Sequence, residues 1–474
     1  FFFQAEHGIR DFCLSRGLGD VYKRQNVGRI KLAVATLDGQ RRTINESVAY
    51  ANQRVQFETP IAKFGAIKQK LANMATNLYA GEAACYRAAK DIEDRIALRD
   101  ASGNSHQEAE LKGVEEYVIE CSILKVACSE HMQSTADEGV QIFGGMGFSA
   151  DAPMETAWRD ARIARIYEGT NEINRMLSVG MLIKKAMKGQ LDLIGPATAV
   201  GEELLGIPDF AIPDFSAPLS QEKHVLENLK KVFLMIAGAG VQKYGTELEE
   251  HQQLLLAVAD ILIEIYLAES AVLRAEKNVG IYGVEAQDYQ VAMSQLYLYQ
   301  ATEKITTKGR EAILGFAEGD EQKALLMGLK RYTKYVEYPN VIALRNKVAD
   351  KVAEDNSYDF YFINLVDLDM LYGHREDPAG YYEGLKIIDD GLDKLMSVLN
   401  DEDIIIITGD HGTDPTDGKT DHSREYVPFV IYKKNLNPKY IGEGNTFSDI
   451  ASTISDIYEI ENIFPGKSSA NHLS

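Results

Sequence analysis

The residues that decide the fold class of most of this chain are 30–48, IKLAVATLDGQRRTINESV. Their large apolar side chains recur at intervals of three, four and seven, at Ile30, Val34, Leu37, Ile44 and Val48. That spacing places them on one face of an amphipathic helix and does not suit a strand. We therefore predict a helix that packs this face against other helices.

The helical signal continues to about residue 355, through segments rich in Ala, Leu, Glu, Lys and Gln. No strand pattern stands out between residues 26 and 355, so we predict antiparallel helices joined by short connections, as in a bundle. The predicted helices are 60–98, 105–137, 151–165, 170–188, 221–242, 247–276, 285–318 and 320–337.

Proline and glycine divide this helical region into two predicted domains. Residues 189–219 contain Pro196, Pro208, Pro213 and Pro218 and are predicted to be a linker between a helical bundle, 26–188, and an additional helical domain, 220–355. Residues 1–25 show no sustained period and resemble the translated read-through of a sequencing adapter. We therefore treat them as an artefactual leader and exclude them from the fold prediction.

Composition excludes several classes of function. The chain has 474 residues, with 71 acidic and 50 basic side chains and a formal charge of -21. So acidic a protein repels nucleic-acid phosphates and anionic lipids, and no apolar run is long enough to span a membrane. Four cysteines without a C-x-x-C pair are too few for a disulfide framework, and no signal-peptide pattern is visible. We predict a cytoplasmic protein.

Two stretches of the bundle carry chemistry. In residues 141–148, QIFGGMGF, three glycines permit positive φ and close approach of a ligand, although the stretch is not a dinucleotide fingerprint and also suits a plain turn. In residues 162–173, RIARIYEGTNEI, Gly169 is predicted to end one helix and Thr170 to cap the next. Glu168 at this break could act as a general base with a raised pKa, or could be an ordinary solvated glutamate.

Several motifs together resemble one enzyme family. They are NVGR (26–29), RVQF (54–57), QIFGGMGF (141–148), RDAR (159–162) and YEGTN (167–171). In this order and spacing they resemble the C-terminal part of acyl-CoA dehydrogenases, most closely the very-long-chain-like branch, over residues 26–355. The resemblance implies a flavoprotein of fatty acid beta-oxidation that desaturates the α–β bond of an acyl-CoA, with Glu168 removing the α proton.

The resemblance also implies a cofactor site and an assembly. The positions that would bind FAD are Arg54, Gln56, Phe57, Gln141, Gly144, Gly145, Thr170 and Glu172. In the family, the positions that match Arg54, Phe57, Gln141 and Gly145 bind the FAD of a neighbouring subunit. Because relatives assemble through this bundle, we expect a homo-oligomer, either a dimer or a tetramer. The family often has Gly after the Phe, whereas this chain has Glu58. Because relatives place further domains before this region, we expect a truncated enzyme with the base and half of a FAD site.

The pattern changes at residues 356–474, which carry 22 acidic and nine basic residues, a net charge of -13. Residues 360–366, 404–407 and 427–432 are predicted strands, and 378–399 and 446–458 are predicted helices. Such alternation predicts a parallel, helix-covered sheet, and hence a partial α/β domain after the mainly α region.

Histidines and aspartates follow the predicted strands of this tail. Imidazole and carboxylate together suit Mn, Zn or Fe. The motifs around them resemble phosphopentomutase, of the alkaline-phosphatase-like superfamily. By that resemblance one Mn would be held by Asp369, His374 and His422, and a second by Asp410 and His411.

The two resemblances belong to unrelated enzymes, and their junction near residues 353–359 lacks a Gly/Ser-rich or Pro-rich linker. The sequence therefore favours a chimaeric chain. Three functions stay open: an acyl-CoA dehydrogenase fragment, which we favour, a metal-dependent phosphotransferase fragment, and a non-catalytic helical assembly module.

Overall fold

The structure is a computed structural model that describes residues 18–103, 105–206, 213–354, 362–416, 418 and 421–473. The chain divides into two compact units, Phe1–Asn356 and Ser357–Ser474. This division falls where the sequence pattern switches from helical to mixed. The two units are described separately below.

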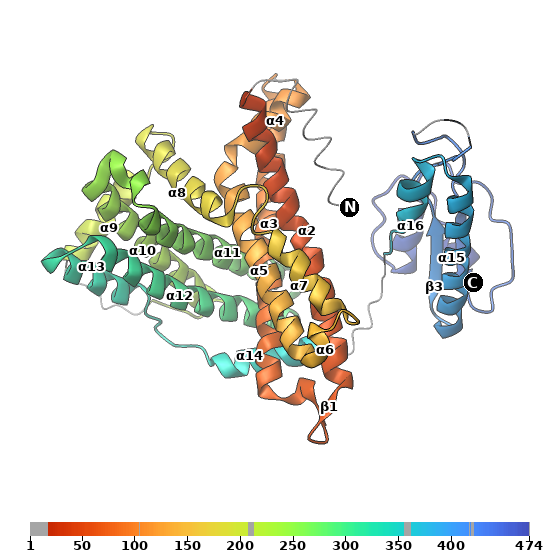
Figure 1. Cartoon of the computed structure of the whole chain (residues 1–474), viewed down its shortest axis with the longest axis horizontal. Coiled ribbons are helices and arrows are strands. Elements are labelled where there is room, and N and C mark those ends of the chain that lie inside the picture. The colour runs from red at the N-terminus through yellow and green to blue at the C-terminus, as the bar shows by residue number, and fades with distance from the viewer. Residues whose placement is uncertain are drawn as a thin grey trace. The chain divides into compact units, whose positions relative to one another are not determined.

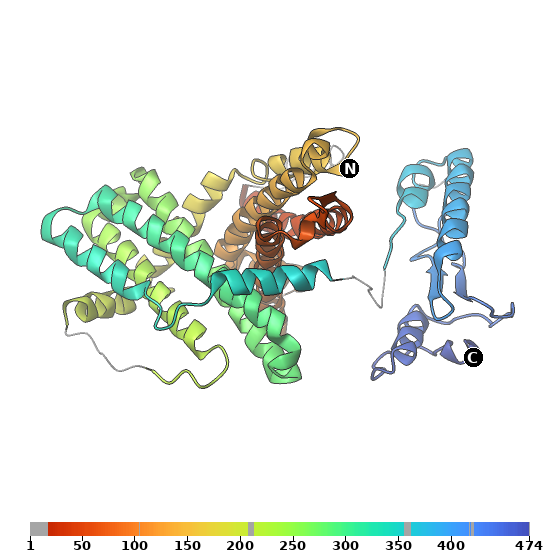
Figure 2. The ribbon, with the colours of Figure 1, turned by 90° about the horizontal axis from the view of Figure 1, so that it is seen from below.

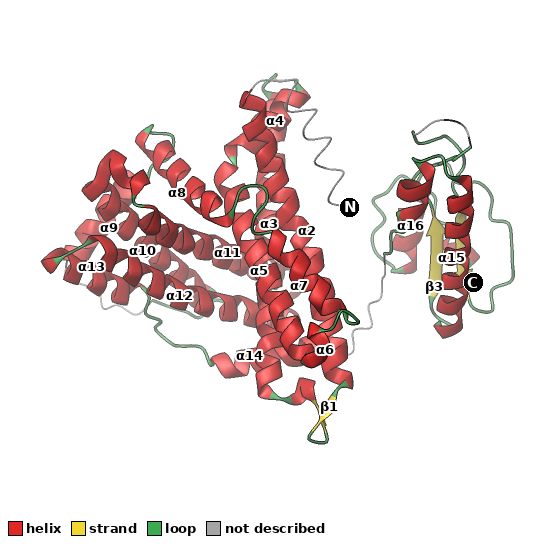
Figure 3. Cartoon of the chain, in the orientation of Figure 1, coloured by secondary structure: helices red, strands yellow, loops and turns green. Residues whose placement is uncertain are grey.

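The first unit is a helical assembly, coloured red to cyan in Figure 1 and almost entirely red in Figure 3. Its α-helices are α2 (Leu18–Gln53), α3 (Gly65–Ala101), α4 (His106–Glu116), α5 (Val118–Phe143), α6 (Gly145–Phe148), α7 (Pro153–Ile163), α8 (Asn171–Met187), α9 (Ile194–Leu205), α10 (Ser220–Tyr244), α11 (Gln252–Tyr282), α12 (Asp288–Phe316), α13 (Gly319–Tyr332) and α14 (Val341–Ala353). Short 3-10 turns are η1 (Ile61–Lys63), η2 (Gly245–Glu250) and η3 (Glu285–Gln287). The predicted mainly helical class is confirmed.

One hydrophobic core runs through this unit from Ala33 to Ala349. Helices α2, α3 and α5 pack along one another, and α3 also contacts α11, α12 and α14. Figure 2 shows α14 lying across the long helices. The two predicted helical domains, 26–188 and 220–355, therefore bury their apolar faces against each other and share a single core.

The first unit differs from the prediction in several places. The expected linker 189–219 contains helix α9, because Pro196 lies in its first turn, where a missing N–H costs little. The predicted helix 105–137 is interrupted at Tyr117, and α14 was not foreseen. Helix α2 begins at Leu18, inside the segment set aside as a leader, of which residues 1–17 lie outside the described residues.

The expectation that residues 26–355 hold no strand is wrong at one hairpin. Strands β1 (Val55–Gln56) and β2 (Thr59–Pro60) pair antiparallel, with Val55 opposite Pro60 and Gln56 opposite Thr59. The hairpin follows α2 directly and lies at the lower end of that helix in Figure 1. It carries Gln56 and Phe57, two of the residues predicted to bind FAD, and Arg54 directly precedes it.

The second unit contains η4, a π-helical turn (Leu368–Gly373), α15 (Pro378–Val398), β3 (Ile404–Thr408), β4 (Phe429–Lys433), α16 (Ser448–Ile457) and the 3-10 turn η5 (Ala470–His472). Both predicted helices and two of the predicted strands are present. The predicted parallel sheet is wrong: β3 and β4 pair antiparallel, with Ile404 opposite Lys433. Residues 362–366, the described part of the other predicted strand, form no strand.

Burial in this second unit is shallow. Among described residues 362–473 no large apolar side chain is fully buried, and Ile404–Ile407, predicted to be buried, are half-buried. Asp449 is a well anchored polar group, since its carboxylate accepts from the backbone N–H groups of Asn445, Thr446 and Lys467. These hydrogen bonds tie α16 to the segments on either side of it.

Candidate active site and candidate metal centre

Glu168 lies in a strained turn between two helices. Helix α7 ends at Ile163, five residues before Glu168, so the prediction that Gly169 directly ends a helix is wrong. The predicted cap is confirmed: Thr170 caps α8, and its Oγ1 accepts from the Ile173 N–H at 3.4 Å. Glu168 and Gly169 have φ of 58° and 82°. A left-handed glutamate is uncommon, and strain of this kind gathers at functional sites.

The Glu168 carboxylate packs against the backbone of helix α2. A Cβ added at Gly28 would lie 2.5 Å from Glu168 Oε2 and 2.7 Å from Oε1. The NVGR motif therefore places its glycine where the carboxylate needs room. The neighbouring Arg29 donates from Nε to the Glu168 carbonyl at 3.4 Å.

This environment changes the acidity of Glu168. Burial raises the pKa of its carboxyl above the ordinary value, while the positive charges of Arg29 and Lys125 oppose the rise. Glu168 is half-buried, so part of it stays accessible. The arrangement suits a group that takes up a proton from a bound molecule.

Two side chains hold the turn through hydrogen bonds to its backbone carbonyls. Asn174 Nδ2 donates to three consecutive carbonyls, those of Glu168, Gly169 and Thr170, at 3.3, 2.8 and 3.1 Å. Lys125 Nζ, from α5, donates to the Gly169 carbonyl at 2.7 Å. Sequence reasoning missed both residues, although a lysine between Ile123-Leu124 and Val126-Ala127 was a visible signal.

The first group of predicted FAD residues is exposed on the hairpin. Phe57 and Glu58 form its tip with φ of 51° and 61°, and Phe57 is 89% exposed. Arg54 and Gln56 are exposed beside them. Glu58 thus adopts the left-handed conformation that glycine favours, at the position where the family often has Gly.

Gln141, Gly144 and Gly145 lie at the junction of α5 and α6. All three are exposed, Gly144 has φ of 61°, and a Cβ at either glycine would meet nothing within 4 Å. The junction lies near the hairpin, because Phe143 stacks on Tyr50 of α2 at 4.2 Å between ring centroids and its carbonyl accepts from the Tyr50 hydroxyl. These residues and the hairpin therefore form one exposed surface.

The predicted base is far from this surface within one chain. Gly28, which touches Glu168, and Gln53, which precedes the hairpin, are separated by roughly 38 Å along α2 at 1.5 Å per residue. Along α5, Lys125 and Phe143 are separated by roughly 27 Å. Thr170 and Glu172 lie at the Glu168 end, where Glu172 is exposed and hydrogen bonds from its own N–H and Thr170 lower its pKa. The predicted site residues thus form two groups.

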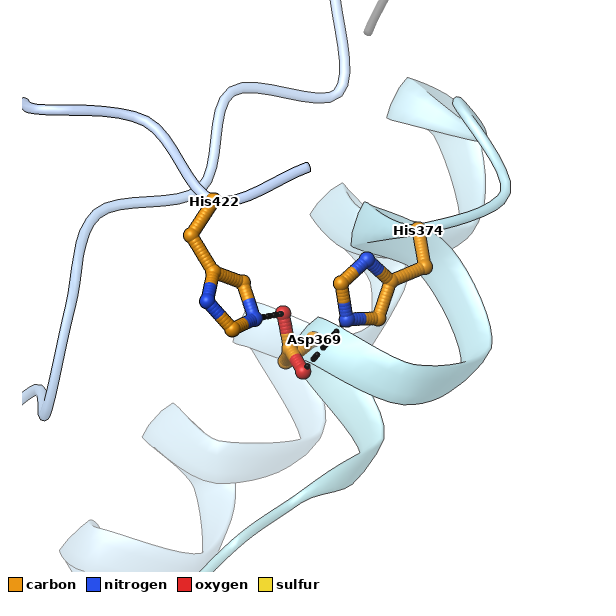
Figure 4. A group of neighbouring side chains, drawn as sticks. All are labelled: Asp369, His374 and His422. Atoms are coloured by element: carbon orange, nitrogen blue, oxygen red, sulfur yellow. Dashed lines mark ion pairs between the residues drawn. The ribbon is translucent and has the colours of Figure 1, made fainter. Parts of the chain in front are cut away.

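In the second unit three predicted metal ligands come together (Figure 4). Asp369, His374 and His422 each offer one ligand atom, and these atoms lie within 4.8 Å of one another. Asp369 Oδ2 lies 3.2 Å from His374 Nε2, and Oδ1 lies 3.7 Å from His422 Nε2. Two imidazoles and a carboxylate suit Mn, Zn or Fe. Asp369 and His374 lie on and just after the π-helical turn η4, a feature often found at functional sites.

The second pair of predicted ligands is only partly assembled. His411 stacks on His422 at 3.5 Å between ring centroids, and its Nε2 lies 3.5 Å from Asp410 Oδ2. The Asp410 side chain is 81% exposed. Sequence reasoning missed Thr413, whose Oγ1 donates to Asp369 Oδ1 at 3.2 Å and so orients that carboxylate.

Within the described part of the chain, no helix combines the length and apolar composition needed to cross a bilayer.

Comparison with known proteins gives two separate matches. Residues 15–181 match the acyl-CoA dehydrogenase C-terminal domain, and residues 228–331 match a second family with the same description. A separate segment is 50% identical over 113 residues to a phosphopentomutase of Dictyoglomus turgidum (strain DSM 6724 / Z-1310), which is 24% of this chain and 29% of that protein.

The helical unit also matches part of a relative and part of a solved structure. The chain is 40% identical over 335 residues to a probable acyl-CoA dehydrogenase of Bacillus subtilis (strain 168), covering 70% of this chain and 56% of the relative. The crystal structure of an acyl-CoA dehydrogenase complexed with FAD from Bacillus anthracis superposes with a TM-score of 0.66 at 40% identity, with the same coverage. The chain thus spans about half the length of these relatives, and through its helical unit it belongs to the acyl-CoA dehydrogenase family.

Proposed function

We propose that the helical unit acts in the FAD-dependent α–β desaturation of an acyl-CoA, with Glu168 as the base. The observation that carries the proposal is the setting of Glu168: a left-handed turn, a carboxylate packed on Gly28, and a pKa raised by burial. Family membership supports the reaction class, and the Bacillus anthracis relative is a complex with FAD.

The chemistry asks Glu168 to remove a proton from the carbon next to a thioester carbonyl. A partly buried carboxylate with a raised pKa is a stronger base than one in water, and its fixed turn limits the positions that it can reach. It must be ionised to act, so the rate should rise with pH through its pKa. The positive charges of Arg29 and Lys125 favour the ionised carboxylate, because they oppose the effect of burial on its pKa.

The residues predicted to hold FAD fit that role. Gly144 and Gly145 leave backbone open to a ligand, and the Phe57 ring and Arg54 guanidinium are exposed near them. Arginine suits a pyrophosphate, which it can bind with two parallel N–H donors. When bound, FAD would supply the acceptor for the hydride that leaves the β carbon. Because this surface is far from Glu168 of the same chain, the proposal includes a homo-oligomer in which one chain supplies the base and another the FAD surface.

The test is flavin binding followed by anaerobic addition of acyl-CoA thioesters of several chain lengths. The chain should retain FAD and lose its flavin absorbance when the substrate is added. Glu168→Gln should retain FAD and stay coloured. The matched control is Glu120→Gln, since Glu120 is another glutamate whose pKa is raised by burial, on α5. Equal bleaching by Glu168→Gln and the original chain would refute the assignment of the base.

A second candidate function rests on the cluster of Asp369, His374 and His422. We propose that it binds a divalent cation such as Mn, the chemistry that a phosphotransferase related to phosphopentomutase would use. Titration with Mn should show one site that His374→Ala removes and that His472→Ala leaves intact, since His472 is outside the cluster and remote from it in sequence. Oligomers that bind neither FAD nor Mn would favour a helical assembly module without catalysis.

A further inference from the structure

We propose that Lys125 is a positioning residue for Glu168: its ammonium group fixes the left-handed turn that carries the base and supplies charge that favours the carboxylate. The inference rests on the proposed role of Glu168. Lys125 does not touch the carboxylate directly, and acts through the backbone of the turn and through the field of its charge.

Burial of Lys125 is the first observation. The side chain is fully buried, yet among the described residues no carboxylate lies within ion-pair distance of its nitrogen. Its acceptors are the Gly169 carbonyl and Asn171 Oδ1, both at 2.7 Å. A buried cation without a direct counter-charge is costly, and a neutral side chain would usually be cheaper. Packing alone therefore does not explain a lysine at this position.

The position of the bonded atoms is the second observation. Gly169 follows Glu168 directly, and Asn171 begins helix α8. Lys125 thus contacts the two residues on either side of Thr170 and holds the part of the turn that directly follows Glu168. Lys125 lies on α5, and α5 packs against both α8 and α2. Because Gly28 is on α2, these contacts fix the turn relative to Gly28.

Asn171 is itself anchored. Its Nδ2 donates to Glu130 Oε1 at 3.1 Å, and Glu130 accepts two parallel hydrogen bonds from Arg175 at 2.9 and 2.8 Å. Arg175 in turn donates to Asp260 of α11 at 2.7 Å. This series of contacts connects the turn to three helices, so Lys125 acts from a rigid frame.

Charge is the third observation. The groups that face Glu168 are Arg29 from α2, Lys125 from α5 and Tyr167 within the turn, and both cations lower the pKa of Glu168. Burial lowers the pKa of Lys125 to about 8, while the negative charges of Glu172, Glu130 and Glu168 oppose this shift. Lys125 is thus mostly protonated at neutral pH and loses its charge in mildly alkaline solution.

The experiment measures Glu168 directly, without substrate or flavin. In the full chain labelled with ¹³C in the glutamate side chains, the signal lost in Glu168→Gln identifies Glu168, and its shift is followed with pH. Lys125→Met should raise the Glu168 pKa and speed amide exchange of Asn171, whose N–H donates to the Arg165 carbonyl, by roughly 10- to 100-fold.

Two further variants separate the effects. Lys125→Gln keeps an N–H donor without charge, so it should raise the Glu168 pKa while retaining slow exchange in the turn. Lys185→Met removes a comparable lysine, which donates to the Glu116 carbonyl at 2.8 Å, and should change neither quantity. If the Lys125 variants that fold leave both the Glu168 pKa and the Asn171 exchange rate unchanged, the inference is overturned, even when the stability of these variants falls. Failure of Glu168→Gln to prevent flavin bleaching would instead refute the proposed function and leave this titration result standing.

Discussion

Gly28→Ala tests whether the Glu168 carboxylate is positioned by the room that a glycine leaves. The added Cβ would lie 2.5 Å from Glu168 Oε2, where ordinary contact begins near 3.4 Å. Because the obstructed atoms are the end of a flexible side chain and α2 is a long helix, the carboxylate should yield by about 1 Å. The helix itself should stay in place.

The expected changes in rate and stability have opposite signs. A displacement of about 1 Å at a reacting group can cost on the order of 100-fold in rate, which we expect for flavin reduction by acyl-CoA. Alanine is favoured over glycine in a helix interior by about 1 kcal/mol, so the free energy of unfolding should be unchanged or slightly higher. The Glu168 pKa should fall towards its ordinary value, because the displaced carboxylate is less buried.

Flavin reduction rates, urea unfolding and the ¹³C titration of Glu168 measure these three quantities. Gly180→Ala is the control, since α8 leaves open space there: a Cβ would meet nothing within 4 Å, and only stability should change. A folded Gly28→Ala chain with the original reduction rate and the original Glu168 pKa would refute the reasoning.

Three other predictions concern the core, the ion-pair network and the metal cluster. Burial lowers the pKa of His131 to about 3, so stability present above pH 6.5 should be lost as pH falls, by up to about 3 kcal/mol at pH 4.5; urea midpoints of His131→Phe should lack most of this loss. Glu130→Ala leaves Arg175 with Asp260 alone and should cost about 2 kcal/mol in urea unfolding; no loss would show that the network is energetically neutral. Thr413→Val removes the hydrogen bond to Asp369 and should weaken Mn binding about tenfold in a titration, whereas unchanged affinity would contradict an orienting role.

Local patterns predicted the helices and the cap well. Ile30, Leu37, Ile44 and Val48 pack inward as their spacing indicates. Val34, predicted on the same face, is 49% exposed, so the prediction is wrong at that position. Thr170 caps α8 because its hydroxyl accepts a hydrogen bond from a backbone N–H of the first helical turn that has no partner within the helix. This preference depends only on residues close in sequence. Such signals are readable because the interaction is local.

Features that depend on distant partners were missed. The hairpin at residues 55–60 has strands of two residues, too short to show any alternation. The pairing of β3 with β4 is antiparallel, and their sequences reveal that each is a strand but not which strand lies beside it. Helix α9 was not predicted because Pro196 was interpreted as a helix breaker. Proline breaks a helix interior but is tolerated in the first turn, where Pro196 lies.

The candidate sites show the same division. Glu168 was predicted from its place at a break and from the motif, but the packing on Gly28 and the contact of Lys125 with Gly169 join residues far apart in sequence. Asp369, His374 and His422 were predicted as one set, and the structure brings them together. Asp410 was predicted to share a second ion but lies exposed.

The placement of Glu168 and the hairpin at opposite ends of α2 has a genetic consequence. In the proposed homo-oligomer, an inactive variant changed at Glu168 and an inactive variant changed at Arg54 should restore activity when they are co-expressed. In a mixed pair, the Arg54 variant supplies an intact Glu168 and the Glu168 variant supplies an intact FAD surface, which together form one complete centre. Two such variants of an enzyme whose centres each lie within a single chain would stay inactive when co-expressed.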